Sequence, residues 1–183
     1  MSVEDTYLLN IRTLPIGESE GEYLITKELF DKFNNTDIIS ANVDCKVKID
    51  RTDRIISLFF SFRGVISVLC DRCLEPLNLN IMAKDVLYMK LGDENIQENE
   101  EDNVVYLHER EMKFDLSQFL YESVLSQKPF RCVHGEVGEG ECNAEMIERI
   151  EKQNVETSNN YLSDNNNKEL DPRWEALKKI DNL

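Results

Sequence analysis

The sequence predicts an α+β fold in which an antiparallel β-meander is braced by one main helix. Apolar and polar side chains alternate along three long runs between residues 37 and 91, separated by short turns. Residues 115–129 carry an apolar stripe at helical spacing that ends at Pro129. No alternation of strand and helix typical of a parallel sheet is found. The meander predicts an open sheet, with curling into a partial barrel as the alternative.

The first half of the chain supplies most of the predicted sheet. Tyr7, Leu9 and Ile11 alternate in a short strand, the stretch "IGESEGEY" (16–23) indicates a turn, and Thr26 is the expected cap of a short helix. Apolar side chains at alternate positions from Ile39 to Ile49 then predict a half-buried strand, with Cys45 as a small buried side chain. A more fully buried strand follows "RTD" (51–53), and another follows the turn "CDRC" (70–73).

The second half supplies the helices. After a short strand in "VVYLHERE" (104–111), residues 116–127 form the clearest helix, with Asp115 as N-cap and Gln118 at the capping-box position. A glycine-rich loop, "RCVHGEVGEGEC" (131–142), precedes a second helix capped by Asn143. The expected buried stripe of the main helix consists of Leu116, Phe119, Leu120, Ser123 and Val124.

Three segments follow from these patterns. Residues 1–153 form one α+β domain, and residues 154–170, which are polar and asparagine-rich, form a disordered linker. Residues 171–183 resume as a short amphipathic helix that begins with an Asp-Pro pair. Its apolar side chains Trp174, Leu177 and Ile180 are a candidate partner-binding face, and packing onto the chain's own domain is the alternative.

The net charge of −15 is concentrated in two places. Residues 93–102 carry six acids and no base, and residues 136–170 carry nine acids and three bases. This distribution argues against tight binding to a phosphate backbone and is compatible with a basic protein partner, or simply with solubility. The N-terminus lacks the pattern of a signal peptide and no apolar run has transmembrane length, so we expect a cytoplasmic protein.

The pair Cys70 and Cys73 allows three interpretations. A redox pair needs a helix after its first cysteine, whereas Pro76 and an alternating stretch follow here, so a redox role is disfavoured. A turn with two thiolates between strands also suits one half of a structural zinc site. The glycine-rich loop would supply the other half through His134 and Cys142, with Cys132 as an alternative ligand. The third interpretation is an ordinary turn with two half-buried thiols.

Four motifs in this order resemble the YceD-like family, a group named for large-subunit ribosomal RNA accumulation. They are "CDRCLEPL" after a meander, "DLSQFLYESVLSQKPF" with "RCVH" behind it, a closing "EC", and "DPRWEALKKI". The family pattern matches Cys70, Arg72, Cys73, Leu120, Glu122, Pro129, His134 and Cys142, while Cys132 stands where a proline is common. The resemblance implies a role in ribosomal RNA accumulation or large-subunit maturation, but neither a chemical mechanism nor a metal.

We therefore expect a non-enzymatic factor in ribosome assembly that binds a basic large-subunit ribosomal protein, with Arg72 among its contacts. No nucleophile elbow, phosphate-binding loop or HExxH motif supports an enzyme. One alternative is direct RNA binding, which would be favoured if the arginines gather on one face. A metal-dependent RNA-processing enzyme and a thiol regulator are further alternatives. The arginines in question are Arg51, Arg54, Arg63, Arg72 and Arg131.

Overall fold

The computed structural model describes residues 6–92, 103–108 and 110–163, with side chains described as far as Gln153. The chain forms two compact units, Met1–Cys142 and Asn143–Leu183. No helix among the described residues is long and apolar enough to cross a membrane. The elements are β1 (Leu8–Asn10), a 3₁₀ turn η1 (Ile11–Thr13), β2 (Gly17–Thr26), α2 (Lys27–Lys32), β3 (Ile38–Arg51), β4 (Ile55–Leu69), β5 (Pro76–Leu91), β6 (Val104–Leu107), β7 (Lys113–Asp115), α3 (Ser117–Leu125) and α4 (Ala144–Ser163).

The first unit is built on a five-stranded sheet in the order β2-β3-β4-β5-β6. The four long strands are antiparallel to their neighbours, and the short β6 runs parallel to β5. The predicted α+β class and antiparallel meander are therefore confirmed. The order has two ends, β2 and β6, so the sheet stays open and does not close into a barrel.

The turn expected at residues 16–23 is wrong, because strand β2 begins at Gly17. It pairs with β3 along its whole length, from Gly17 opposite Arg51 to Thr26 opposite Asn42. Glutamate, glycine and serine have low strand propensity, which is why the sequence indicated a turn. The backbone ladder with β3 outweighs that local preference. The ion pairs Lys48–Glu18 and Lys46–Glu22 add little, because all four side chains are at least half exposed.

One face of the sheet is the core. Alternate side chains of β3 and β4 point to it, and Phe60 and Phe62 are among its largest fully buried members. A register shift between Ile38 and Ser40 puts Ile38 in the core and leaves Ile39, predicted to point inward, 41% exposed. The other face is open to solvent, as antiparallel sheets allow.

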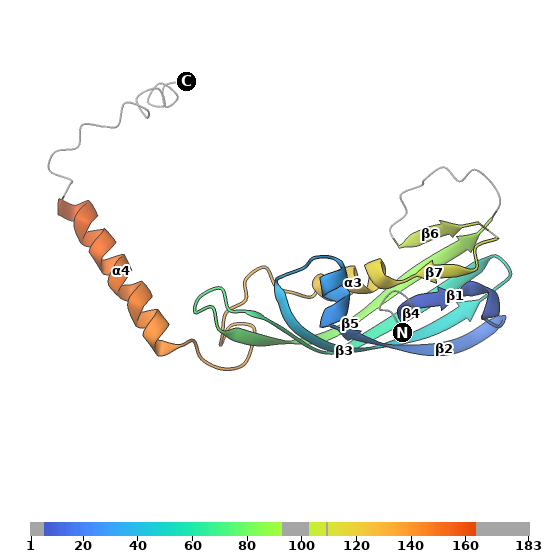
Figure 1. Ribbon diagram of the computed structural model, residues 1–183, viewed down its shortest axis with the longest axis horizontal. Coiled ribbons are helices and arrows are strands. Elements are labelled where there is room, and N and C mark those ends of the chain that lie inside the picture. The colour runs from blue at the N-terminus through green and yellow to red at the C-terminus, as the bar shows by residue number, and fades with distance from the viewer. Residues whose placement is uncertain (1–5, 93–102, 109, 164–183) are drawn as a thin grey trace, which may run out of the picture. The chain divides into compact units, whose positions relative to one another are not determined.

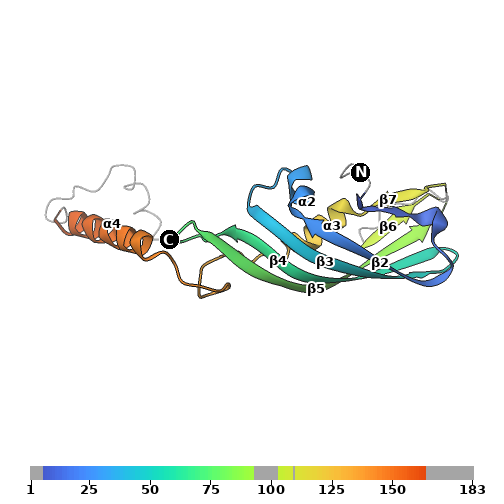
Figure 2. The ribbon, with the colours of Figure 1, turned by 60° about the horizontal axis from the view of Figure 1, so that its bottom comes forward.

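Helices α2 and α3 and the small β1–β7 pair cover the core face (Figures 1 and 2). From α3, Leu120 and Val124 are fully buried, as predicted, and the Phe119 ring lies 4.8 Å from that of Phe60. The Ser123 hydroxyl donates a hydrogen bond of 2.8 Å to the Asp85 carboxylate on β5. This contact fixes the helix directly to the sheet.

The start of α3 differs from the predicted capping box. The helix begins at Ser117 after Leu116, and Gln118 bonds to Glu122 on the next turn instead of closing a box. Asp115 still serves the helix end, because its carboxylate accepts the Ser117 backbone N–H at 2.8 Å and the Lys32 ammonium at 2.9 Å. Partial burial acts to raise the pKa of Asp115, but these bonds outweigh it and the pKa lies below its usual value.

We expect Asp115→Asn to lower the free energy of unfolding by about 1 kcal/mol at neutral pH, since it removes a charge-assisted contact at a helix end. A carboxyl whose pKa is lowered by folding stabilises the fold above its unfolded pKa, and this contribution is lost as the pH falls through the folded pKa. The difference between variant and wild type should therefore shrink as the pH falls below about 3.9, the usual value for an aspartate, and be smaller at pH 3 than at pH 7. Urea denaturation of both proteins at pH 7 and pH 3 measures it. An equal difference at both values would contradict the assignment.

The second unit begins with the predicted cap. The Asn143 side-chain oxygen accepts the backbone N–H groups of Glu145 and Met146 at 3.0 and 3.3 Å, and α4 runs from Ala144 to Ser163. The boundary between the two compact units falls after Cys142, within the predicted domain 1–153. Residues 154–163, expected to be a disordered linker, have helical backbone, because extending a capped helix costs less than starting one. Residues 164–170 and the predicted helix 171–183 lie outside the described residues.

Candidate metal centre

The cysteine pair lies in the hairpin between β4 and β5, as predicted. Within the turn, the Cys70 N–H donates to the Glu75 carbonyl and the Leu74 N–H donates to the Cys70 carbonyl, both at 2.9 Å. Leu74 adopts a left-handed backbone conformation, with φ of 60°, which tightens the turn. Cys70 and Cys73 are thereby buried at the end of the sheet, although the turn itself is on the surface.

The glycine-rich loop brings His134 to the same place. The His134 ring has Nδ1 3.4 Å from the Cys73 Sγ and Nε2 3.2 Å from the Pro76 carbonyl oxygen. The second contact fixes the orientation of the ring, as is typical of a metal-binding histidine. Gly138 lies so close to β5 that a Cβ there would be 2.8 Å from the Asn78 carbonyl oxygen. The loop can therefore reach the hairpin only because this position carries no side chain.

Asp71 and Cys132 hold the two halves of the site together. The Asp71 N–H donates to the Cys132 carbonyl at 2.7 Å, and the Cys132 N–H donates to the Asp71 carboxylate at 2.6 Å. The Cys132 Sγ instead lies 3.4 Å from the Pro129 carbonyl, away from the other cysteines. Cys132 therefore supports the loop through its backbone, and the predicted alternative ligand is not part of the cluster.

Cys70, Cys73, His134 and Cys142 form a cluster that could hold a metal ion. Their ligand atoms all lie within 4.8 Å of one another, and the Sγ atoms of Cys70 and Cys142 are 3.9 Å apart. In a tetrahedral zinc site with bonds of about 2.3 Å, two sulfur ligands are about 3.8 Å apart. The four residues that the sequence singled out therefore have the spacing that a tetrahedral ion requires.

The electrostatics of the cluster favour a thiolate at Cys70. Burial opposes it, but hydrogen bonds from the backbone of Cys73, His134 and Arg72 lower the pKa of Cys70 to about 6. Burial and the neighbouring thiols raise the pKa of Cys142 to about 11. Of these two thiols, Cys70 therefore ionises first as the pH rises. A bound cation would favour deprotonation of the other thiols as well.

The cluster has the composition of a structural site. Three sulfur atoms and one imidazole make a complete tetrahedral set, and a catalytic site would need one position left for water or substrate. The pair also lacks the geometry of a redox motif, because β5 and not a helix follows Cys73. What the cluster can do is join the β4–β5 hairpin to the loop that follows α3.

Of the other predicted residues, Arg72 lies in the cysteine turn itself, where its backbone N–H donates to the Cys70 Sγ at 3.4 Å. The arginines proposed for RNA contact are spread along the sheet: Arg54 precedes β4, Arg63 lies within it and Arg72 follows it. Fifteen residues of strand separate the first from the last, about 50 Å of extended chain. Arg131 pairs with Glu136 at 3.4 Å. The gathering of arginines that would favour the alternative of direct RNA binding is therefore not found along this strand. Trp174, Leu177 and Ile180 lie outside the described residues, and Arg72 stays a predicted contact.

Sequence reasoning missed three residues that build the site: Asp71, Pro76 and Gly138. The Asp71 carboxylate accepts the Cys132 backbone N–H, and the Pro76 carbonyl contacts the His134 ring. Gly138 lets the loop approach β5 because it has no side chain. An Asp between two cysteines and a glycine in a ligand loop were the only available signals. Neither signal shows which distant backbone group Asp71 or Gly138 contacts.

Fold and site together define a class: an open-sheet α+β protein with a Cys₃His cluster that joins a hairpin to a loop. A family model described as "Large ribosomal RNA subunit accumulation protein YceD" matches residues 58–181. The match covers more than half of the chain, which belongs to the YceD family. It begins within β4 and includes all four cluster residues. Searches of curated proteins and of solved structures found no match.

Proposed function

We propose that this protein supports the accumulation of large-subunit ribosomal RNA as a non-enzymatic factor that binds a basic large-subunit ribosomal protein. We further propose that the Cys₃His cluster binds zinc as a structural ion and that the protein acts in the cytoplasm. The observation that carries the proposal is the family match, whose description names this process. The geometry of the cluster supports a binding role.

The metal cluster supports a binding role over catalysis. Its four ligands complete a tetrahedron, so a zinc ion there would have no place for a reacting water. The two cysteines on the hairpin are buried and held by the turn. Zinc at this position would stabilise the end of the sheet and the loop before the second unit, and so present both to a partner.

The charge of the chain supports a basic partner. The net charge is −15, and the acids include a row on β2, Glu18, Glu20 and Glu22, whose side chains are exposed. A surface of this kind repels RNA phosphate and attracts lysine and arginine, and it speeds encounter with a basic protein at low salt. Such a protein would be shielded from premature contact with RNA.

The experiment measures both halves of the proposal. In cells depleted of the protein, we expect the ratio of large-subunit to small-subunit ribosomal RNA to fall and to be restored by the wild-type chain. In vitro, we expect the purified protein to bind one or a few basic proteins from a salt-extracted large-subunit protein fraction, with affinity that falls as salt rises. An unchanged ratio on depletion, or no binding at low salt, would contradict the proposal.

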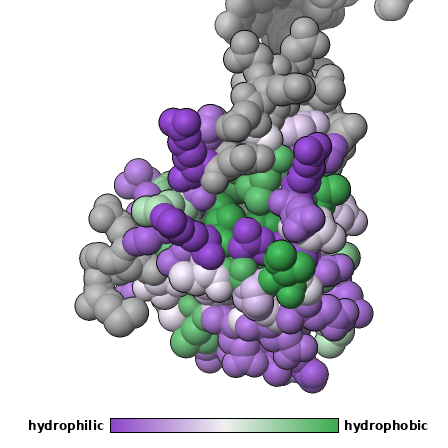
Figure 3. Space-filling model, turned by 90° about the vertical axis from the view of Figure 1, so that its right-hand side faces the viewer, coloured by the Kyte–Doolittle hydropathy of each residue, from purple (hydrophilic) through white to green (hydrophobic). Residues whose placement is uncertain are grey.

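Direct contact with ribosomal RNA is a second candidate, favoured by one observation. Arg12, Arg51 and Arg110 line a hollow of about 420 Å³ at one end of the sheet. Figure 3 looks onto this end of the first unit and shows apolar side chains framed by hydrophilic ones. The Arg51 guanidinium donates to the Ile11 and Leu14 carbonyls, so those of Arg12 and Arg110 are the ones that suit a phosphate here. Filter binding of ribosomal RNA fragments to wild type and Arg110→Gln would test this candidate.

A further inference from the structure

Strand β2 ends the sheet on one side, and glutamates are the only one of the usual edge protections that its sequence carries. Edge strands expose a row of backbone N–H and C=O groups, and proteins guard them with proline, charged side chains such as lysine, bulges or short length. Strand β2 has ten residues, contains neither proline nor lysine, and pairs with β3 without a register shift. Within the described part of the chain, its ladder partner is β3 alone.

The contacts of Tyr7 show which backbone groups of β2 point outward. The Tyr7 hydroxyl donates to the Leu24 carbonyl at 3.0 Å, and the backbone and side chain of Thr26 also bond to it. In an antiparallel strand, alternate residues direct their N–H and C=O groups to the same side. The groups of Glu18, Glu20 and Glu22 therefore point away from β3, as those of Leu24 do. Tyr7 satisfies the edge only at its Leu24–Thr26 end.

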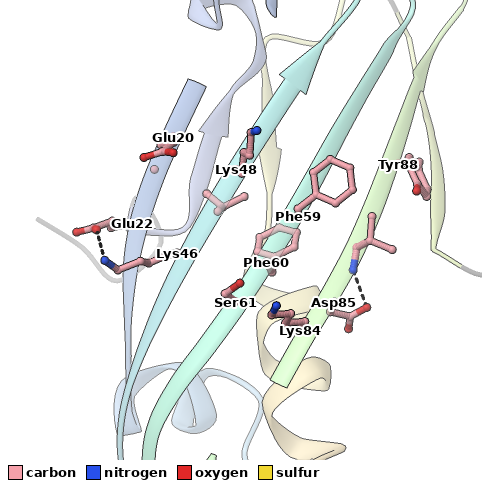
Figure 4. A pocket seen from close by; sticks show the side chains of 13 residues that line it. Glu20, Glu22, Lys46, Lys48, Phe59, Phe60, Ser61, Lys84, Asp85 and Tyr88 are labelled. Atoms are coloured by element: carbon pink, nitrogen blue, oxygen red, sulfur yellow. Dashed lines mark hydrogen bonds and ion pairs between the residues drawn. The ribbon is translucent and has the colours of Figure 1, made fainter. Parts of the chain in front are cut away.

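The same three residues carry the acidic side chains of the edge. Figure 4 shows Glu20 and Glu22 on the outer strand, beside Lys46 and Lys48 of β3. Glu22 pairs with Lys46 at 3.4 Å and Glu18 with Lys48 at 2.9 Å, both in exposed positions. No salt bridge is recorded for Glu20 among the described residues. Leu24, next in this alternate series, is 49% exposed.

We propose that an extended basic segment of the ribosomal partner adds to the sheet as a further strand along Glu18–Glu22. Its backbone pairs with the outward N–H and C=O groups, and its lysine or arginine side chains, at alternate positions, lie directly opposite the three glutamates. An apolar side chain of the segment lies beside Leu24. The inference rests on the proposed function and specifies how the partner is held.

The test uses the full chain and two synthetic peptides of equal composition. One has lysine at every second position with valine and threonine between, and the other has its lysines contiguous. Fluorescence anisotropy should show that the wild type binds the alternating peptide at least tenfold more tightly. Amide NMR shifts should concentrate at Glu18, Glu20 and Glu22. Equal affinity for both peptides would overturn the inference, because charge alone would then explain binding.

Variants at Glu20 separate the contribution of the backbone hydrogen bonds to peptide binding from that of the side-chain charge. Glu20→Pro removes an outward N–H without touching the β3 ladder and should abolish the preference for the alternating peptide. Glu20→Gln keeps the N–H and should weaken binding only about threefold, as expected for one exposed cross-strand pair. Glu20→Lys, a second variant that keeps the backbone intact, should weaken it further. Glu151→Lys on α4 makes the same charge change in the second unit and should leave the preference intact.

The outcomes distinguish this inference from the proposed function. If large-subunit proteins bind wild type, Glu20→Pro and Glu20→Lys alike, the partner is held elsewhere and the edge proposal fails while the function stands. If the alternating peptide binds as described but no large-subunit protein does, the proposed function and the ribosomal origin of the segment fail, while strand addition of a basic segment at this edge stands.

Discussion

Replacing Cys73 with serine should lower the melting temperature by about 10 °C and abolish metal binding. A hydroxyl is a poor ligand for a soft-ligand site, and three remaining ligands hold zinc weakly. Loss of the ion would free the loop 130–142 from the β4–β5 hairpin, and the free energy of ligand binding would no longer add to that of folding. We expect a loss of about 3–5 kcal/mol in the free energy of unfolding, which corresponds to this shift in a chain of this size.

The measurement is thermal denaturation of wild type and Cys73→Ser, each with and without a strong chelator. The chelator should lower the melting temperature of the wild type nearly to that of the variant and leave the variant unchanged. Cys132→Ser is the matched control, since Cys132 is also buried but points its sulfur at a carbonyl. It should cost some stability yet stay sensitive to the chelator. If the chelator left the melting temperature of the wild type unchanged, this result would contradict a structural metal ion.

Gly64→Ala should be the most destabilising substitution by a single methyl group, because it forces β3 and β4 apart. A Cβ at this position would lie 2.2 Å from the Asn42 carbonyl oxygen and 2.5 Å from the Val43 Cα. Both are backbone atoms in the middle of the sheet, where no flexible side chain can yield. We expect a loss of about 3 kcal/mol or more in the free energy of unfolding, at the upper end of overpacking effects.

Urea denaturation of the variant and of a matched glycine variant checks this expectation. Gly92 follows β5, and a Cβ there meets nothing within 4 Å, so Gly92→Ala should change the free energy of unfolding by less than about 0.5 kcal/mol. Similar stability of the two variants would show that the sheet adjusts at Gly64 more easily than the close contact of β3 and β4 implies.

The long strands could be predicted because burial on one face imposes a period of two on their sequence. Val43, Cys45 and Val47 alternate with charged neighbours, and this pattern survives without knowledge of the partners. The pattern fails at β2, where the same alternation is made of Ser19, Gly21 and glutamates. Strand structure there depends on the β3 backbone, which lies far along the chain. The prediction that Ile39 points into the core was wrong for a related reason. A register shift depends on how two strands pair, and the sequence of one strand does not show it.

The metal cluster could be predicted only as two halves. The ligand types and the "CDRC" turn were visible in the sequence, but the loop offered both Cys132 and Cys142 as sulfur ligands. The choice depends on the hydrogen bonds between Asp71 and Cys132, which turn the Cys132 side chain away and carry the chain on to Cys142. Contacts between residues about 60 positions apart leave no periodic signal in either segment.

The division after Cys142 was also beyond the sequence. The Asn143 cap and the apolar positions that follow predicted a helix but not whether it packs on the sheet. The asparagine-rich residues that follow favoured a linker by composition, whereas helix continuity extends α4 through Ser163. Amino-acid composition indicates the intrinsic conformational preference of a segment. It does not indicate whether a helix that begins before the segment continues into it.

Native mass spectrometry of protein purified without added metal shows whether the Cys₃His cluster binds an ion. We expect one zinc ion per chain, released by a strong chelator together with a fall in melting temperature, and absent from Cys73→Ser but present in Cys132→Ser. A metal-free wild type of equal stability would contradict it. The hairpin and the loop would then be joined without an ion, by the Asp71–Cys132 hydrogen bonds and the contacts of His134 with Cys73 and Pro76.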